Sequence, residues 1–120
     1  MAEPSQVLLI DSDATSRQLV RLLLEARWPE MAITEAHDPV GLARAMRVPT
    51  QDLCVVDLNL SWAEPLELLE MLCTDEEIGP VVVYTEHNQA DLALHALKLG
   101  ASNYIVKDAK GPLRLMEALI

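Results

Sequence analysis

The feature that most constrains the fold of this chain is a regular alternation of short apolar runs with longer stretches of helical periodicity. Runs that are apolar at every position, rather than at every second one, are typical of parallel strands covered on both faces. Because a helix length separates successive runs, the pattern predicts one α/β domain with a five-stranded parallel sheet and helices on both faces. The expected strands are 7–10, 31–34, 53–56, 81–84 and 104–106, and the expected helices are 15–27, 40–47, 65–73, 90–99 and 113–120.

Signals at the helix ends support these boundaries. Asp13 is a suitable N-cap for the first helix, and Pro65 can open the third, since the first helical position needs no amide hydrogen. Asn88 and Asp91 have the spacing of a capping pair before the fourth helix. Gly100 fits the position after that helix.

The composition indicates one small domain. The chain has 120 residues, of which 51% are hydrophobic, and a formal net charge of -10. The negative charge predicts that this domain binds neither nucleic acid nor anionic lipid directly. The sequence shows no membrane span or signal peptide, so we expect a cytoplasmic protein. The last expected helix begins near Pro112 and stops on an apolar residue after about nine positions, so we expect 1–120 to be one domain of a longer protein.

The cysteines and histidines show no spacing typical of a metal or redox site. Cys54 lies within an apolar run and Cys73 ends a helical pattern, so both are expected to be inert thiols. His37, His87 and His95 are not paired with one another or with a candidate nucleophile.

Polar residues that follow four of the apolar runs give the main functional signal. They are Asp11, Asp57, Thr85 and Lys107. The carboxyl ends of parallel strands form the ligand crevice of an open α/β sheet. Two carboxylates, a hydroxyl and an ammonium should therefore converge there, a set that suits phosphoryl transfer to an oxygen nucleophile.

This chemistry suggests a role for each group. Asp57 is the candidate nucleophile and would form an acyl phosphate. Because the incoming phosphoryl group is anionic, a hard cation and an ammonium must offset the repulsion. Asp11, Asp57 and the backbone carbonyl of Asn59 would hold a hydrated Mg²⁺. Lys107 would pair with one phosphoryl oxygen, and Thr85 would donate a hydrogen bond to another.

The segments that carry these residues resemble successive motifs of the receiver domains of bacterial two-component response regulators. They are Leu8-Leu9-Ile10-Asp11, Val55-Val56-Asp57-Leu58-Asn59, Val83-Tyr84-Thr85 and Gly100-Ala101-Ser102-Asn103-Tyr104-Ile105-Val106-Lys107, and the resemblance spans residues 7–119.

The resemblance implies a doubly wound, flavodoxin-like sheet in the order 2-1-3-4-5. It further implies a non-enzymatic phosphoacceptor that receives a phosphoryl group on Asp57 from a histidine kinase or phosphotransfer protein, with a C-terminal output domain in the full-length protein. The implied switch moves Thr85 toward the phosphoryl group while Tyr104 rotates inward.

The chain departs from that family pattern at the metal site. The family usually has two adjacent acidic residues after the first strand, whereas this chain has Asp11, Ser12 and Asp13. A neutral hydroxyl is a poorer magnesium ligand than a carboxylate, so Ser12 predicts weakened metal binding unless Asp13 compensates. We expect Asp13 to cap the first helix instead.

Two loops depart from the pattern as well. After the third strand, Ser61 and Pro65 stand where the family often has proline and glycine, and Trp62 lies between them. Trp62 either packs over this loop or anchors a partner. Asp108, rather than proline, follows Lys107, which predicts a trans peptide bond.

Three functions remain open on the sequence. The first is a phosphoacceptor signalling domain that uses Asp57. The second is a degenerate receiver that binds partners without phosphorylation, which Ser12 and the altered loop favour. The third is a phosphatase similar to the haloacid dehalogenase type, whose first motif resembles 10–15 with Asp11 as nucleophile. The third function leaves Asp57 unexplained and lacks the acidic pair that this family needs after its lysine.

Overall fold

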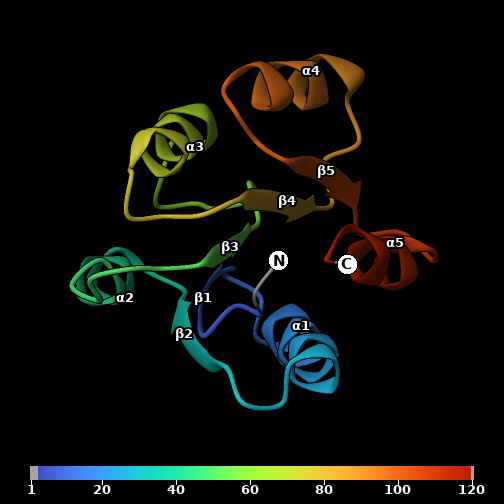
Figure 1. Ribbon diagram of the computed structural model, residues 1–120. Helices are drawn as coiled ribbons and strands as arrows, with labels where there is room; N and C mark the ends of the chain where they lie inside the picture. Colours follow the sequence, from blue (N-terminus) through green and yellow to red (C-terminus); the bar gives the residue numbers. More distant parts are fainter. Residues whose placement is uncertain (1–2, 120) are drawn as a thin grey trace.

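The computed structural model describes residues 3–119 and is built around a five-stranded parallel sheet (Figure 1). The strand order is β2-β1-β3-β4-β5, so the expected fold class and order are confirmed. The elements in chain order are β1 Gln6–Ile10, α1 Ala14–Arg27, β2 Ala32–Ala36, α2 Pro39–Ala45, β3 Leu53–Val56, α3 Pro65–Thr74, β4 Val81–Thr85, α4 Ala90–Lys98, β5 Asn103–Val106 and α5 Gly111–Ala118.

Two helical layers enclose the sheet, with α1 and α5 on one face and α2, α3 and α4 on the other (Figure 1). Successive side chains of a strand point to opposite faces. Accordingly, Val7 and Leu9 of β1 join the core under α1 and α5, whereas Leu8 and Ile10 join the core under the other three helices. Both faces of the central strands are covered, which explains why these runs are apolar at every position.

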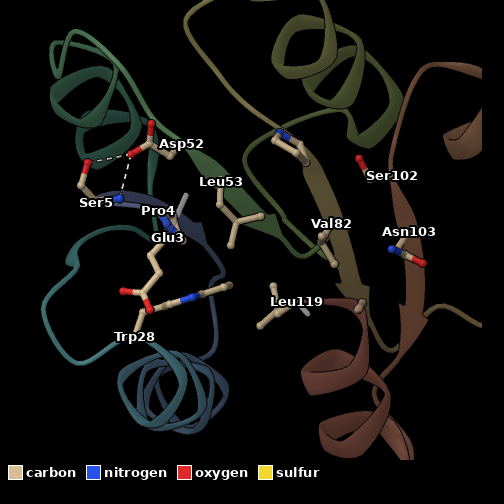
Figure 2. Close-up of a pocket in the computed structure, with 12 residues that line it drawn as sticks. Glu3, Pro4, Ser5, Trp28, Asp52, Leu53, Val82, Ser102, Asn103 and Leu119 are labelled. Atoms are coloured by element: carbon tan, nitrogen blue, oxygen red, sulfur yellow. Dashed lines mark hydrogen bonds between the residues drawn. The ribbon is translucent and has the colours of Figure 1, made fainter. Parts of the chain in front are cut away.

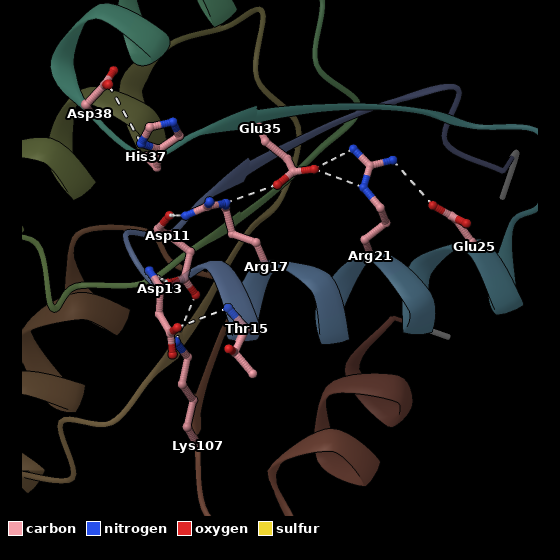
Figure 3. A network of polar contacts seen from close by, with 10 residues as sticks. All are labelled: Asp11, Asp13, Thr15, Arg17, Arg21, Glu25, Glu35, His37, Asp38 and Lys107. Atoms are coloured by element: carbon pink, nitrogen blue, oxygen red, sulfur yellow. Dashed lines mark hydrogen bonds and ion pairs between the residues drawn. The ribbon is translucent and has the colours of Figure 1, made fainter.

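The edge strand β2 differs from its expected bounds, 31–34. Its pairing with β1 runs from Gln6 opposite Ala32 to Ile10 opposite Ala36, so the strand begins and ends later than the apolar pattern indicates. The charged Glu35 is accommodated in it because its carboxylate forms ion pairs with two arginines of α1 (Figure 3).

Several expected helix ends are confirmed. Asp13 is the N-cap of α1, and its side chain accepts a hydrogen bond of 3.0 Å from the amide of Thr15. Pro65 occupies the first turn of α3. Gly100 follows α4 with a φ of 114°, a left-handed conformation that favours glycine.

The expected capping pair of Asn88 and Asp91 is wrong. The N-cap of α4 is Gln89, whose side chain makes no capping hydrogen bond. Because the helix begins one residue later than that spacing requires, Asp91 instead places its charge in the first turn, where the helix dipole favours an anion. The helix α2 ends at Ala45 rather than at residue 47. The expected end of the last helix, Ile120, lies outside the described residues.

Among residues 3–119, no helix combines the length and the apolar character that crossing a membrane would require.

Candidate functional site

The predicted polar residues lie at the carboxyl ends of neighbouring strands. Asp11 follows β1 and Asp57 follows β3, whereas Thr85 ends β4 and Lys107 follows β5. The strand pairing continues to these residues through main-chain hydrogen bonds. The amide of Asp57 donates to the carbonyl of Ile10 at 2.8 Å, and the amide of Lys107 donates to the carbonyl of Thr85 at 2.7 Å. These residues therefore lie together at the edge of the domain formed by the carboxyl ends of the strands.

Lys107 joins the two aspartates into one cluster. Its Nζ donates hydrogen bonds to Asp11 Oδ2 at 2.8 Å and to Asp57 Oδ2 at 2.7 Å. The side chains of Lys107, Asp11 and Asp57 are only 10%, 3% and 5% exposed. One ammonium faces two carboxylates, so the buried cluster carries excess negative charge that suits a cation.

The charge state of Lys107 follows from two opposing effects. Burial disfavours the charged ammonium and lowers its pKa. The hydrogen bonds and the charges of Asp11 and Asp57 outweigh burial, so the pKa of Lys107 lies above its ordinary value. The lysine is therefore a fixed cation at the cluster.

Loop amides orient both carboxylates. Asp11 Oδ1 accepts a hydrogen bond from the amide of Asp13, and Asp57 Oδ1 accepts one from the amide of Asn59, each at 2.9 Å. The other oxygen of each carboxylate is the one that contacts Lys107. The two aspartates are thus held from two sides before any ligand binds.

The oxygen donors of this cluster fit a hydrated Mg²⁺. Asp11 and Asp57 offer carboxylates, and Asn59 is exposed, where its carbonyl would complete the set with water. Neither residue after Asp11 adds a carboxylate ligand, because Ser12 is neutral and Asp13 caps α1. Within residues 3–119 no three or more histidine, cysteine or acidic side chains come together as a metal site, so the cluster offers only two carboxylates.

The side chains of Thr85 and Tyr104 both contact the main chain of His87. Thr85 is fully buried, and its hydroxyl accepts a long hydrogen bond of 3.4 Å from the amide of His87. The hydroxyl of Tyr104 donates to the carbonyl of His87 at 2.8 Å. Burial and the charge of Asp57 raise the pKa of Tyr104. The residue that connects these two side chains, His87, was not predicted as part of the site.

Arg17 of α1, which was not predicted as part of the site, binds the main chain of Asp11 (Figure 3). Arg17 Nη1 donates to the main-chain carbonyl of Asp11 at 2.8 Å, and its Nε donates to Glu35 at 3.0 Å. Arg21 binds the other oxygen of Glu35 at 2.6 Å and also pairs with Glu25. This network ties the β1–α1 loop to the edge strand, and nothing in the local sequence pattern identifies it.

Trp62 is half-buried and packs against the core beneath α2, α3 and α4. Its Nε1 donates a hydrogen bond of 3.2 Å to Ser12 Oγ. Of the two interpretations of this residue, packing over the loop is therefore confirmed.

The remaining expectations concern groups outside the cluster. Cys54 is buried, which raises the pKa of its thiol, and Cys73 is partly buried; both are free. In residues 3–119 no peptide bond is cis, so the bond after Lys107 is trans as expected.

A pocket of about 420 Å³ lies at the opposite edge of the sheet, at the amino ends of the strands (Figure 2). Trp28, Leu53 and Leu119 are among the residues that line it. Glu3 and Asp52 are its acidic lining residues, and Asp52 already accepts hydrogen bonds from the amides of Ser5 and Gln6. The pocket is thus separate from the Asp11, Asp57 and Lys107 cluster.

Residues 7–120 match the family model of the response regulator receiver domain. A protein-glutamate methylesterase/protein-glutamine glutaminase 1 of Rhizobium johnstonii is 30% identical over 115 residues, which are 95% of this chain and 33% of that protein. The nitrate/nitrite response regulator protein NarL of Escherichia coli is 32% identical over 120 residues, which are 98% of this chain and 54% of that protein. The chain therefore spans only part of the length of these relatives.

Solved structures agree with the family match. A response regulator protein from Burkholderia pseudomallei, with a phosphorylated aspartic acid, a calcium ion and citrate, superposes with a TM-score of 0.79 at 27% identity, over 97% of this chain and 66% of that chain. A signal receiver domain from Colwellia psychrerythraea gives a TM-score of 0.83 at 17% identity, over 95% and 94% of the two chains, which supports the fold. With its sheet order, its family match and these neighbours, the chain belongs to the response regulator receiver domain family.

Proposed function

We propose that this chain is a phosphoacceptor domain that receives a phosphoryl group on Asp57 from a histidine kinase or a phosphotransfer protein. The observation that carries the proposal is the contact of Lys107 Nζ with Asp57 Oδ2 at 2.7 Å and with Asp11 Oδ2 at 2.8 Å. A nucleophilic carboxylate beside a fixed cation at the ligand edge of the sheet suits phosphoryl transfer.

The cluster suggests how the transfer proceeds. A carboxylate oxygen of Asp57 attacks the phosphorus of the donor phosphohistidine, a P–O bond forms, the P–N bond breaks, and the electron pair of that bond returns to the imidazole. Lys107 exchanges its hydrogen bond with Asp57 for one with a phosphoryl oxygen. Mg²⁺ held by Asp11, Asp57 and the carbonyl of Asn59 would supply the positive charge that offsets repulsion between the anionic reactants.

The contacts of His87 suggest how phosphorylation alters the surface. If the Thr85 side chain moves toward a phosphoryl oxygen to donate to it, the contact of its hydroxyl with the amide of His87, already 3.4 Å long, would break. The carbonyl of the same residue accepts the Tyr104 hydroxyl. A shift of this segment would therefore couple Thr85 to Tyr104 and carry the signal from the acceptor to the face formed by α4, β5 and α5.

The comparisons support placing this domain in a longer signalling protein. The relatives contain two to three times as much chain, and the methylesterase activity in one of their names belongs to that protein. We infer that 1–120 is a cytoplasmic receiver domain, not itself an enzyme, that regulates a C-terminal output domain.

The degenerate receiver is the second candidate function. Ser12, which stands where the family usually has an acidic ligand, accepts a hydrogen bond from Trp62. This observation favours a site that binds metal weakly. The phosphatase hypothesis loses support because residues 7–120 match the receiver domain family, and because it leaves the buried Asp57 without a role.

Mapping the phosphorylated residue tests these functions against one another. The chain is incubated with acetyl phosphate and Mg²⁺, the acyl phosphate is reduced with borohydride, and the resulting homoserine is located by mass spectrometry. The proposal expects homoserine at position 57. Homoserine at position 11 would instead support the phosphatase, and no homoserine would support the degenerate receiver.

Restoring a carboxylate at position 12 is expected to tighten Mg²⁺ binding. Ser12→Asp adds an anionic oxygen beside Asp11, and we expect an affinity at least tenfold above that of the wild type, measured by calorimetry. The matched control is Ser61→Asp, which adds the same charge in the exposed loop after β3. Equal affinities of Ser12→Asp and the wild type would mean that another group already fills the ligand position.

A further inference from the structure

Two departures of this chain from the family pattern meet in one contact. Trp62 belongs to the loop between β3 and α3, and Ser12 to the loop between β1 and α1. The Trp62 indole donates to Ser12 Oγ at 3.2 Å across a separation of 50 residues. These are the loops that follow Asp57 and Asp11. The contact, named here the Trp62–Ser12 latch, therefore joins the two sides of the cluster.

Packing fixes the latch from the tryptophan side. The Trp62 ring is half-buried and lies against the core beneath α2, α3 and α4. An indole has a single polar hydrogen and no acceptor, so this side chain can only donate. With its ring held by the core, Trp62 directs that hydrogen toward the Ser12 oxygen.

Because Trp62 is the donor of this hydrogen bond, the contact disfavours the binding of a cation to Ser12 Oγ. The indole hydrogen occupies a lone pair of Ser12 Oγ, and the positive end of the N–H dipole lies beside that oxygen. The hydroxyl oxygen has a second lone pair, but a cation that uses it must lie close to the positive end of this dipole, which makes Ser12 a weaker ligand. The neighbouring Asp13 does not compensate, because its side chain caps α1.

We propose that Trp62 sets the metal affinity of the phosphorylation site by holding Ser12 in the latch. This inference rests on the proposed function, in which Asp11 and Asp57 hold Mg²⁺. Trp62 is a positioning residue that acts through Ser12 and competes with the cation for its hydroxyl. A neutral hydrogen bond near solvent is a modest competitor, so the latch tunes Mg²⁺ affinity by about three- to tenfold rather than blocking the site.

The test removes the indole N–H donor of Trp62 and keeps an aromatic ring at this position. Trp62→Phe retains aromatic packing and lacks the indole hydrogen, so it is expected to bind Mg²⁺ about three- to tenfold more tightly than the wild type in a calorimetric titration. Trp28→Phe, at the other tryptophan far from the cluster, is expected to leave the affinity unchanged. Equal or weaker binding by Trp62→Phe would overturn the proposal.

Measuring Trp62→Phe in a Ser12→Ala variant distinguishes the effect of the hydrogen bond on Mg²⁺ affinity from an effect of changing the ring. In Ser12→Ala the acceptor is absent, so Trp62→Phe is expected to produce no further change in Mg²⁺ affinity. The same three- to tenfold gain in this background would show that the ring, rather than the hydrogen bond, is responsible, and would overturn the proposal.

The indole proton gives a direct reading in the wild type. Addition of Mg²⁺ is expected to shift the Trp62 Nε1–H resonance and to leave that of Trp28 in place. Binding of Mg²⁺ with no shift at Trp62 would overturn the latch alone and leave the proposed function standing. Absence of Mg²⁺ binding in every variant would overturn the latch together with the metal site on which the proposed function rests.

Discussion

Asp57→Asn is expected to abolish phosphorylation by acetyl phosphate in the presence of Mg²⁺. The neutral amide oxygen is too weak a nucleophile to form the acyl bond, so labelling should fall below detection, as measured by a phosphate-affinity gel or by intact mass. The variant is expected to stay folded, because Lys107 also contacts Asp11, at 2.8 Å in the wild type, and Asp57→Asn does not alter that carboxylate.

Two further variants make this result specific. Asp108→Asn changes an exposed carboxylate that directly follows Lys107 and pairs with Arg114 at 3.4 Å, and it is expected to be labelled like the wild type. Asp11→Asn removes a proposed metal ligand but keeps the nucleophile, so labelling is expected to slow by at least tenfold and to persist at long times. Full labelling of Asp57→Asn would contradict the assignment of the acceptor.

The central strands could be predicted from the sequence because their signal is local. A strand covered on both faces is expected to be a continuous apolar run, and β3 and residues 7–10 of β1 and 81–84 of β4 have this pattern. The position of the cluster follows from topology, since the carboxyl ends of parallel strands share one edge. Asp11 and Asp57 come together because β1 and β3 are paired neighbours.

The contacts of Glu35 with α1 and of Trp62 with Ser12 could not be predicted, because each joins residues distant in sequence. The pairing of β1 with β2 and the ion pairs of Glu35 with α1 decide where the edge strand ends. No local pattern shows that Arg17 binds the carbonyl of Asp11, or that Trp62 reaches Ser12. The residues of the cluster could therefore be predicted from the sequence, whereas the side chains of other elements that support it could not.

Lys107→Met is expected to lower the free energy of unfolding by about 3 kcal/mol at neutral pH, in urea denaturation with a chelator present. The change leaves the carboxylates of Asp11 and Asp57, 3% and 5% exposed, without the cation that both contact. Lys110→Met, at an exposed lysine nearby, is expected to change stability by less than about 0.5 kcal/mol.

Relief of the excess negative charge should restore the stability of Lys107→Met. Millimolar Mg²⁺ is expected to raise the free energy of unfolding of this variant more than that of the wild type, because the cation replaces the missing ammonium. Adding Asp57→Asn to Lys107→Met removes one carboxylate and should recover part of the loss without metal. A double variant no more stable than Lys107→Met would show that lost packing, rather than charge, explains the destabilisation.

The pH dependence of stability gives an independent measure of the same interaction. The pKa of Lys107 is raised in the folded protein above its ordinary value of 10.5, so the folded state holds this proton more tightly than the unfolded state. The stabilisation is then fully present below about pH 10.5 and is lost as the pH rises through the folded pKa.

Wild-type stability should fall in that range by up to about 1.4 kcal/mol per pH unit on account of this group. Lys107→Met should lack this contribution and keep the decline from the thiols of Cys54 and Cys73 and the phenols of Tyr84 and Tyr104, whose pKa values burial also raises. Parallel alkaline declines in the wild type and in Lys107→Met would mean that Lys107 gains nothing from its two carboxylates on folding.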